Sequence, residues 1–200
     1  MNLLNNCTDK TPSNDLKWIN EPLDYHFNDG NVTINVPPMS DFFRDPAGTC
    51  IKDSAPFLHI ETMEDFVLTT RVNVEMIEEY DSACLMIMKN QKNWAKVCYE
   101  YIKGIPTIVS VVTKDTSDDC VSSNVGHCNP YLRIQKLGNC FGFHYSLDSI
   151  TWEMVRYFYL DCSEKIKVGI VAQSPIGQGC NVKFEFVDFE IRKVNDVRVV

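Results

Sequence analysis

The sequence predicts an all-β protein in which two antiparallel sheets pack face to face as a sandwich. Short segments that alternate apolar and polar residues recur through most of the chain, turn-forming residues separate them, and no segment keeps an apolar repeat of helical period. The clearest alternation runs through residues 81–113, where we expect three successive strands. Many short strands joined by hairpins bury one face each, which indicates a β-sandwich.

The expected strands follow one another at fairly even spacing, and each combines β-branched, aromatic and other apolar residues in period-two order. In chain order they cover residues 32–36, 57–61, 66–74, 83–89, 95–101, 107–113, 132–137, 141–146, 152–160, 165–172 and 182–192. The segments between them contain residues that favour positive φ or fix φ. These turns lie at Asp29-Gly30, Lys103-Gly104-Ile105-Pro106, Gly138-Asn139, Asp148-Ser149 and Ser174-Pro175-Ile176-Gly177.

Two stretches interrupt this rhythm, the proline-rich residues 37–56 and the polar residues 114–130. We expect both to be long loops, and residues 76–80 to form a short turn. Because binding and catalytic residues lie on loops more often than in strands, these two stretches are the first places to look for function.

Length and composition favour one domain over residues 1–200, with its core at about 18–192, since 200 residues suit a single β-sandwich. The net charge is -8 and no cluster of Lys and Arg occurs, so we expect no nucleic-acid partner. The apolar runs are far shorter than the roughly 20 residues that cross a bilayer. The polar start of the chain lacks the apolar stretch of a signal peptide, so we expect no membrane association and a cytoplasmic location.

The nine cysteines are an odd number without a CxxC pair, which favours free thiols that pack as small apolar residues. Cys120, His127 and Cys128 lie close together in the sequence, but two sulfurs and one imidazole are too few for a structural zinc site. Asp115, Asp118 and Asp119 lack the glycine-spaced pattern of a calcium loop. We therefore predict no metal site and no cofactor, and leave a local bridge between Cys120 and Cys128 as the alternative.

Four motifs resemble a known family. They are residues 94–100 (WAKVCYE), residues 110–113 (SVVT) followed by Thr116-Ser117-Asp118, residues 146–156 (SLDSITWEMVR) and residues 168–175 (VGIVAQSP). In order and spacing they are similar to the DUF1349 family, over nearly the whole chain from Trp18 to Ile191. The resemblance implies the concanavalin A-like lectin/glucanase fold, a jelly-roll β-sandwich. One residue departs from the family pattern: Ser149 stands where a glycine is usual, so we expect a turn that needs no positive φ there.

The candidate ligand site comes from the polar face of the strand at residues 95–101. Alternation places Trp94, Lys96, Cys98 and Glu100 on one face of that strand. If the sheet curves as the resemblance implies, charged residues from other strands join them on a concave face, where arginine forks and a tryptophan ring suit a sugar or a small anionic ligand. The predicted ligand-binding residues are Trp94, Lys96, Glu100, Ser110, Arg133 and Arg156. The alternative is a solvated face on which these charges form cross-strand ion pairs.

Evidence for catalysis is weak in the sequence. Glucanases of this fold use two closely set carboxylates, yet the pattern Glu-x-Asp-x-x-Glu is absent, and strand alternation separates Glu185 from Asp188 and Glu190 unless a bulge intervenes. The four histidines are scattered, and none accompanies a nucleophile motif. We therefore predict no catalytic residues.

The leading hypothesis is a non-catalytic module that binds a carbohydrate or small metabolite. A second hypothesis is a regulatory interaction protein of a metabolic enzyme, which the resemblance implies because the family includes a fungal protein named for the regulation of enolase. A glycoside hydrolase is the weaker alternative, because the fold hosts lectins, glycosidases and interaction domains alike.

Overall fold

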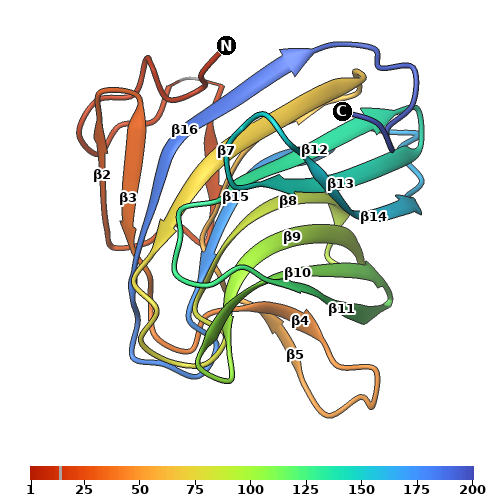
Figure 1. Ribbon diagram of the computed structural model, residues 1–200. Helices are drawn as coiled ribbons and strands as arrows, with labels where there is room; N and C mark the ends of the chain where they lie inside the picture. Colours follow the sequence, from red (N-terminus) through yellow and green to blue (C-terminus); the bar gives the residue numbers. More distant parts are fainter. Residues whose placement is uncertain (14) are drawn as a thin grey trace.

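The computed structural model describes residues 1–13 and 15–200, and it consists of strands, turns and loops. Two seven-stranded antiparallel sheets pack against each other, and a two-stranded hairpin lies outside them (Figure 1). This is the β-sandwich that the strand pattern predicts, and it agrees with the concanavalin A-like jelly roll that the family resemblance implies. Within the described ranges, the structure contains no helix of the length and apolar character needed to cross a membrane.

We name each sheet after one of its central strands. In spatial order, the β9 sheet contains β1 (Lys17–Ile19), β6 (Phe57–Thr62), β15 (Ile166–Gln173), β8 (Ser82–Asn90), β9 (Asn93–Ile102), β10 (Ile105–Lys114) and β11 (Thr116–Asn124). The β7 sheet contains β14 (Glu153–Tyr159), β13 (Cys140–Ser146), β12 (Tyr131–Leu137), β7 (Phe66–Val74), β16 (Asn181–Ile191), β3 (Asn31–Asn35) and β2 (Asp24–Asn28). The separate hairpin pairs β4 (Phe42–Arg44) with β5 (Ile51–Asp53).

The expected strands are all present, but the expected loop at residues 114–130 is wrong. Most of it is strand β11, which pairs with β10 along its length and closes one edge of the β9 sheet. The sequence TSDDCVSSN hides this strand because an exposed edge strand needs few apolar residues. The proline-rich stretch at 37–56 likewise contains the short β4–β5 hairpin, and β1 and β2 are further strands that the sequence did not reveal.

Strand β9 contributes to packing on both of its faces. Ala95, Val97 and Tyr99 point into the core between the two sheets. Trp94 and Cys98 point to the opposite, outer face, as alternation predicts, where they join a second apolar cluster with Phe42 of β4. The hairpin thus covers part of the outer face of the β9 sheet, and Figure 1 shows it beside β11 on the side away from the β7 sheet. Burial on both faces explains why β8, β9 and β10 also carry apolar residues, such as Trp94 and Cys98 of β9, on the face that points away from the core.

The turn at Ser149 corrects a second expectation, because Ser149 adopts a positive φ of 66°. Side chains rather than a glycine hold this turn. Ser146 Oγ accepts a hydrogen bond from the Ser149 amide at 2.9 Å, and Asp148 Oδ1 accepts from the amides of Ile150 and Thr151 at 2.8 and 2.7 Å. These bonds lower the pKa of Asp148 to about 2. They offset the strain of a left-handed serine.

We predict that Gly169→Ala destabilises the protein because two strands approach each other closely at this point. A β-carbon at Gly169 would lie 2.0 Å from the carbonyl oxygen of Leu58 on β6, so the backbone of β6 or β15 must move. We expect a loss of about 1–3 kcal/mol in the free energy of unfolding, measured by urea denaturation. A variant as stable as the unmodified protein would contradict this packing.

His59 predicts a pH dependence of stability. Its side chain is buried, neither ring nitrogen has a hydrogen-bond partner among the residues described, and burial, aided by Lys167, lowers its pKa to about 4. A histidine whose pKa is lowered by folding contributes stability that is full above its unfolded-state pKa of about 6.5 and is lost as the pH falls toward 4.

The test compares His59→Gln with the unmodified protein by urea unfolding at pH 7.5 and pH 4.5. The substitution is expected to cost less at pH 4.5 than at pH 7.5, by roughly 2–3 kcal/mol. An equal cost at both pH values would show that His59 titrates normally.

Candidate functional site

A pocket of about 340 Å³ opens on the outer face of the β9 sheet, next to the β4–β5 hairpin. We call it the Glu100 pocket. Its floor is formed by Lys96 and Glu100 of β9 with Val109 and Val111 of β10. The walls come from several other segments and comprise Asp41, Phe43, Cys50, Lys52, Tyr80, Asp119, Gln173, Pro175 and Ile176.

Strand register explains why these floor residues meet. Lys96 and Glu100 share a face of β9 because side chains alternate along a strand. On β10, Val111 lies opposite Lys96 and Val109 lies opposite Cys98, so both valines project to the same face. The pocket therefore has a polar row along β9 and an apolar row along β10.

The ammonium of Lys96 is buried and takes part in three hydrogen bonds. Its Nζ donates to the carbonyl oxygen of Phe42 at 2.8 Å, to Gln173 Oε1 at 2.9 Å and to Asp41 Oδ1 at 3.4 Å. Burial acts to lower the pKa of Lys96, but the Asp41 carboxylate and nearby acidic groups outweigh it and raise the pKa above its usual value. Lys96 is therefore a fixed positive charge with all three of its donors in use.

The carboxyl group of Glu100 has no such partners. Only 8% of the residue is exposed, and no hydrogen bond or ion pair to its side chain is found within the described part of the chain. Burial, opposed by Lys96 and assisted by Asp41 and Asp119, raises the pKa of Glu100 to about 8. A largely buried carboxyl with a raised pKa and no protein partner in the described chain, at the floor of an open pocket, makes Glu100 a candidate functional residue.

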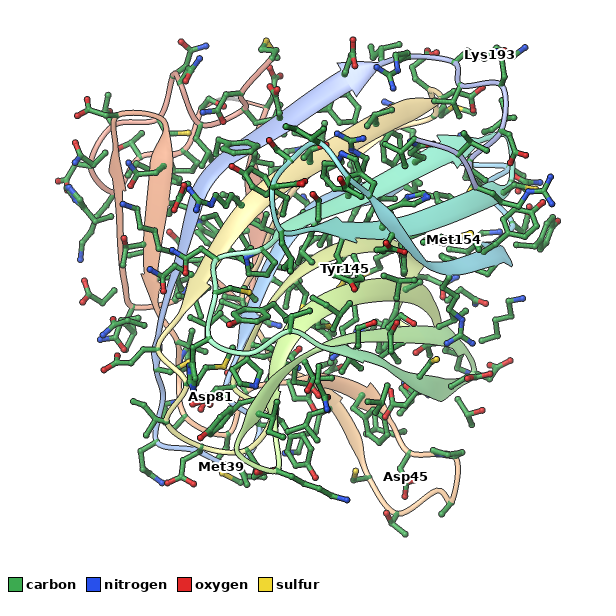
Figure 2. All side chains as sticks on the ribbon, in the orientation of Figure 1. Met39, Asp45, Asp81, Tyr145, Met154 and Lys193 are labelled. Atoms are coloured by element: carbon green, nitrogen blue, oxygen red, sulfur yellow. The ribbon has the colours of Figure 1, made fainter. Side chains whose placement is uncertain are left out.

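The rim of the pocket is held by a buried hydrogen bond and carries a strained residue. Ser174 Oγ donates to Asp81 Oδ1 at 2.6 Å, which ties the loop after β15 to the turn before β8. Met39 and Asp81 lie at this same end of the sandwich, whereas Asp45 lies far out at the tip of the hairpin loop (Figure 2). Tyr80 has a φ of 72°, which is unusual for an aromatic residue and frequent at binding sites.

Trp94 shares a face with Lys96 but does not reach the pocket. Only 1% of it is exposed, because the ring of Phe42 packs across it with centroids 6.2 Å apart. The expectation that Trp94 offers its ring to a ligand is therefore wrong. Its indole ring forms part of the outer apolar cluster, with the Lys96 ammonium 5.7 Å from its centroid.

Ser110 was expected on the same surface and lies on the opposite one. It is the register partner of Val97 and alternates with Val109 and Val111, so its side chain points into the core between the sheets. Its hydroxyl group is buried there without a hydrogen-bond partner among the described residues. Ser110 does not belong to the pocket.

The two predicted arginines lie elsewhere as well. Arg133 is on β12 of the other sheet, where its guanidinium stacks on Trp152 at 3.6 Å from the ring centroid. Arg156 is on β14, and its Nη2 lies 3.0 Å from Oδ1 of Asp118 on β11. The six-residue groove is therefore wrong as a unit, and the structure brings together only Lys96 and Glu100.

The alternative of cross-strand ion pairs describes part of this arrangement. Lys96 pairs with Asp41 and Arg156 pairs with Asp118, although neither pair joins neighbouring strands of one sheet. Glu100 remains outside both pairs. Its isolation distinguishes the pocket from an ordinary solvated sheet face.

The carboxylates of β16 do not form a catalytic pair. A bulge between Phe184 and Phe186 interrupts the alternation that was expected at Glu185. Even so, Glu185 pairs with Arg71, Asp188 pairs with the chain's amino terminus and Glu190 pairs with Arg192. Each acid thus has its own partner on the surface.

All nine cysteines are unpaired thiols. Cys120 is exposed on β11 and Cys128 is half-buried after it, without a bridge between them. In the described residues, no three His, Cys, Asp or Glu side chains come together in a way that could hold a metal ion.

Sequence reasoning missed most of the pocket wall. Asp41, Phe43 and Lys52 come from the proline-rich stretch that was singled out only as a loop of interest, and Gln173 lies in the motif at 168–175. The signal that could have found Asp41 is the buried lysine itself, because a lysine inside a sheet requires a carboxylate nearby.

Comparison with known proteins agrees with this fold. This chain has the fold of lectin I-B4 from Griffonia simplicifolia, a concanavalin A-like protein. The two superimpose with a TM-score of 0.60 at 11% identity, over 95% of this chain and 98% of the lectin. The GH43 BlXynB protein from Bacillus licheniformis superimposes with a TM-score of 0.74 at 12% identity, over 96% of this chain and 39% of that one. At such identities the likeness shows the fold alone.

The chain belongs to the DUF1349 family, described as a protein of unknown function, whose model matches residues 18–192. "Regulation of enolase protein 1" from Saccharomyces cerevisiae is 29% identical over 168 residues, which is 84% of this chain and 85% of that protein. A crystal structure of a functionally unknown protein from the same yeast has a TM-score of 0.84 and 26% identity, and the match covers 89% of this chain and 97% of that one.

We predict that Glu100→Gln stabilises the protein at pH 8 and leaves its stability nearly unchanged at pH 5. Folding raises the pKa of Glu100, so the protonated carboxyl carries no penalty at low pH. As the pH rises from about 4.5 to 8, the unfolded chain loses this proton more readily than the folded protein, and the folded protein becomes less stable. A neutral amide of the same shape removes that penalty. The gain in the free energy of unfolding between the two pH values is expected to be about 2–4 kcal/mol, measured by urea denaturation. A gain that does not depend on pH would contradict the raised pKa.

Proposed function

We propose that this protein is a non-catalytic binding module that holds a carbohydrate or another small metabolite in the Glu100 pocket. The observation that carries the proposal is the buried carboxyl of Glu100, which lines an open pocket without a partner in the described chain. A hydroxyl or amino group of a ligand would supply the missing hydrogen bonds. We expect the module to act in the cytoplasm.

The lining suits a small polar ligand. Val109, Val111, Pro175 and Ile176 provide apolar surface for a sugar ring or carbon chain, and Tyr80 stands half-exposed at the rim. The fixed network around Lys96 holds one wall of the pocket in place before any ligand arrives. A wall that needs no rearrangement lowers the entropic cost of binding.

The test is a thermal-shift panel of glycans and metabolites with two isoleucine variants. Ile176 is 48% exposed on the pocket wall and Ile191 is 67% exposed at the end of β16 in the other sheet, so Ile176→Trp fills the pocket and Ile191→Trp is its matched control. A ligand at 100 times its dissociation constant stabilises by roughly 2.7 kcal/mol. We expect this shift in the unmodified protein and in Ile191→Trp, and no shift in Ile176→Trp.

Three outcomes would contradict the proposal. The first is a ligand that shifts all three proteins equally, because it would bind outside the pocket. The second is a panel without any hit. The third is turnover of a glycoside, which would make the protein an enzyme, since a raised carboxyl pKa is also a property of general acids.

A regulatory interaction protein of a metabolic enzyme is the second candidate, favoured by one feature of the surface and by the name of the yeast relative. Exposed apolar side chains gather on the edge strand β14 and the loop before it, at Leu147, Ile150, Met154, Tyr157 and Tyr159. Figure 2 shows Met154 at the outer end of the β7 sheet. An apolar edge of this kind is typical of interaction sites.

A further inference from the structure

In the Glu100 pocket, the lysine at the floor has its hydrogen-bond partners and the glutamate beside it has none in the described chain. Each donor of the Lys96 ammonium already has an acceptor, and Lys52 at the rim donates to the carbonyl oxygen of Pro175 at 2.8 Å. Glu100, by contrast, has an unpartnered carboxyl group within the described chain. A ligand therefore meets a floor on which the donors of Lys96 are already used and the carboxyl group of Glu100 is not.

The charge of the pocket points the same way. Asp41, Glu100 and Asp119 line it together with only two lysines, Lys96 and Lys52. Burial raises the pKa of Asp119 as well, with Asp41 adding to the effect against Lys96. For Glu100 and Asp119 alike, burial is the main reason that ionisation is disfavoured, and the pull of Lys96 does not overcome it.

The shape of the pocket adds a further restriction. Apolar side chains of Phe43, Val109, Val111 and Ile176 line it beside the carboxyl group, so a ligand that reaches Glu100 passes along carbon surface. A buried carboxylate at the end of an apolar wall is best matched by a cation on a carbon stem, because the cation needs the carboxylate and the stem needs the wall.

We propose that the Glu100 pocket takes a ligand that bears a primary ammonium group on an aliphatic or sugar stem, and that this ammonium is the missing ion-pair partner of Glu100. The inference rests on the proposed function, since it names the chemical class of the ligand for the same pocket. The proposal predicts that an amine binds in preference to a neutral sugar or an anion.

Proton exchange distinguishes these ligand classes. In the empty pocket Glu100 holds a proton at neutral pH, because its pKa is about 8. An alkylammonium, whose own pKa is near 10, stays charged and binds the ionised carboxylate, so a proton leaves on binding and affinity rises with pH. A neutral alcohol leaves Glu100 protonated, and an anion binds more weakly as the pH rises.

Other groups near Glu100 titrate or carry charge and contribute to the pH dependence of binding. They are Lys96 and Cys98 on β9, Cys84 on β8, Asp41 before β4, Cys50 before β5, Lys52 on β5, Glu79 and Tyr80 in the turn before β8, and Asp119 on β11. Glu79 accepts a hydrogen bond from the Lys103 amide at 2.9 Å. The pKa of Glu100, at about 8, lies inside the pH range of the experiment.

The experiment compares matched pairs of probes by isothermal titration calorimetry. The pairs are n-butylamine and 1-butanol, 5-amino-1-pentanol and 1,5-pentanediol, and glucosamine and glucose. We expect at least one amine to bind at least tenfold more tightly than its alcohol at pH 7. For the alkylamines we also expect a rise in affinity of at least fivefold from pH 6 to pH 8, with proton release seen as a dependence of the heat on the buffer.

Two substitutions assign the effect to Glu100. Glu100→Gln keeps the shape of the side chain and removes its charge, and is expected to abolish the preference for amines. Glu185→Gln, in the other sheet, is the control that keeps it. The proton release of the unmodified protein tests the proposal without any variant.

The inference is overturned if no amine binds at up to 10 mM, if alcohols bind as tightly as amines, or if affinity falls as the pH rises. A neutral ligand that Ile176→Trp excludes would overturn the inference and leave the proposed function intact. If neither the probes nor the wider panel binds in the pocket, both fail.

Discussion

The buried ammonium of Lys96 is the interaction on which the outer face of the β9 sheet depends. It joins β9 to two segments that are far away in the sequence. Asp41 and Phe42 supply two of its acceptors, and Gln173 on β15 supplies the third. A charged lysine is stable inside a protein only when it is fully paired, so these acceptors must stay in place. The segment leading into β4 is thereby held over the sheet, Phe42 is held on Trp94, and a pocket remains between the hairpin and β10.

Glu100 is the exception in an otherwise satisfied region. It is on the same strand and the same face as Lys96, yet the lysine's donors are taken by other groups and the carboxyl stays protonated instead. Folded proteins tend to retain such an imbalance where a ligand completes it. The strained backbone of Tyr80 at the same rim agrees with this view, because sparsely populated conformations cluster at binding sites.

Local patterns in the sequence were sufficient for most of the strands and for the two faces of β9, because alternation is a property of neighbouring residues, but not for β1, β2, β4, β5 and β11. They could not place Arg133 and Arg156, whose positions depend on which sheet a strand joins, nor Ser110, whose face follows from its register with Val97. Asp41 illustrates the limit most clearly: it lies 55 residues from Lys96 in the sequence and pairs with it only because the hairpin folds back over the sheet. Ser149 shows that side-chain hydrogen bonds can hold a left-handed turn without glycine.

The central claim is that one carboxyl group on the floor of the pocket is left without a partner and therefore holds its proton at neutral pH. The most direct measurement is a titration of the glutamate side-chain carboxyl ¹³C resonances by NMR, with the signal of Glu100 assigned as the one that disappears in Glu100→Gln. The account predicts that this signal changes with a midpoint near pH 8. A midpoint near 4.5, as for a solvated glutamate, would contradict it.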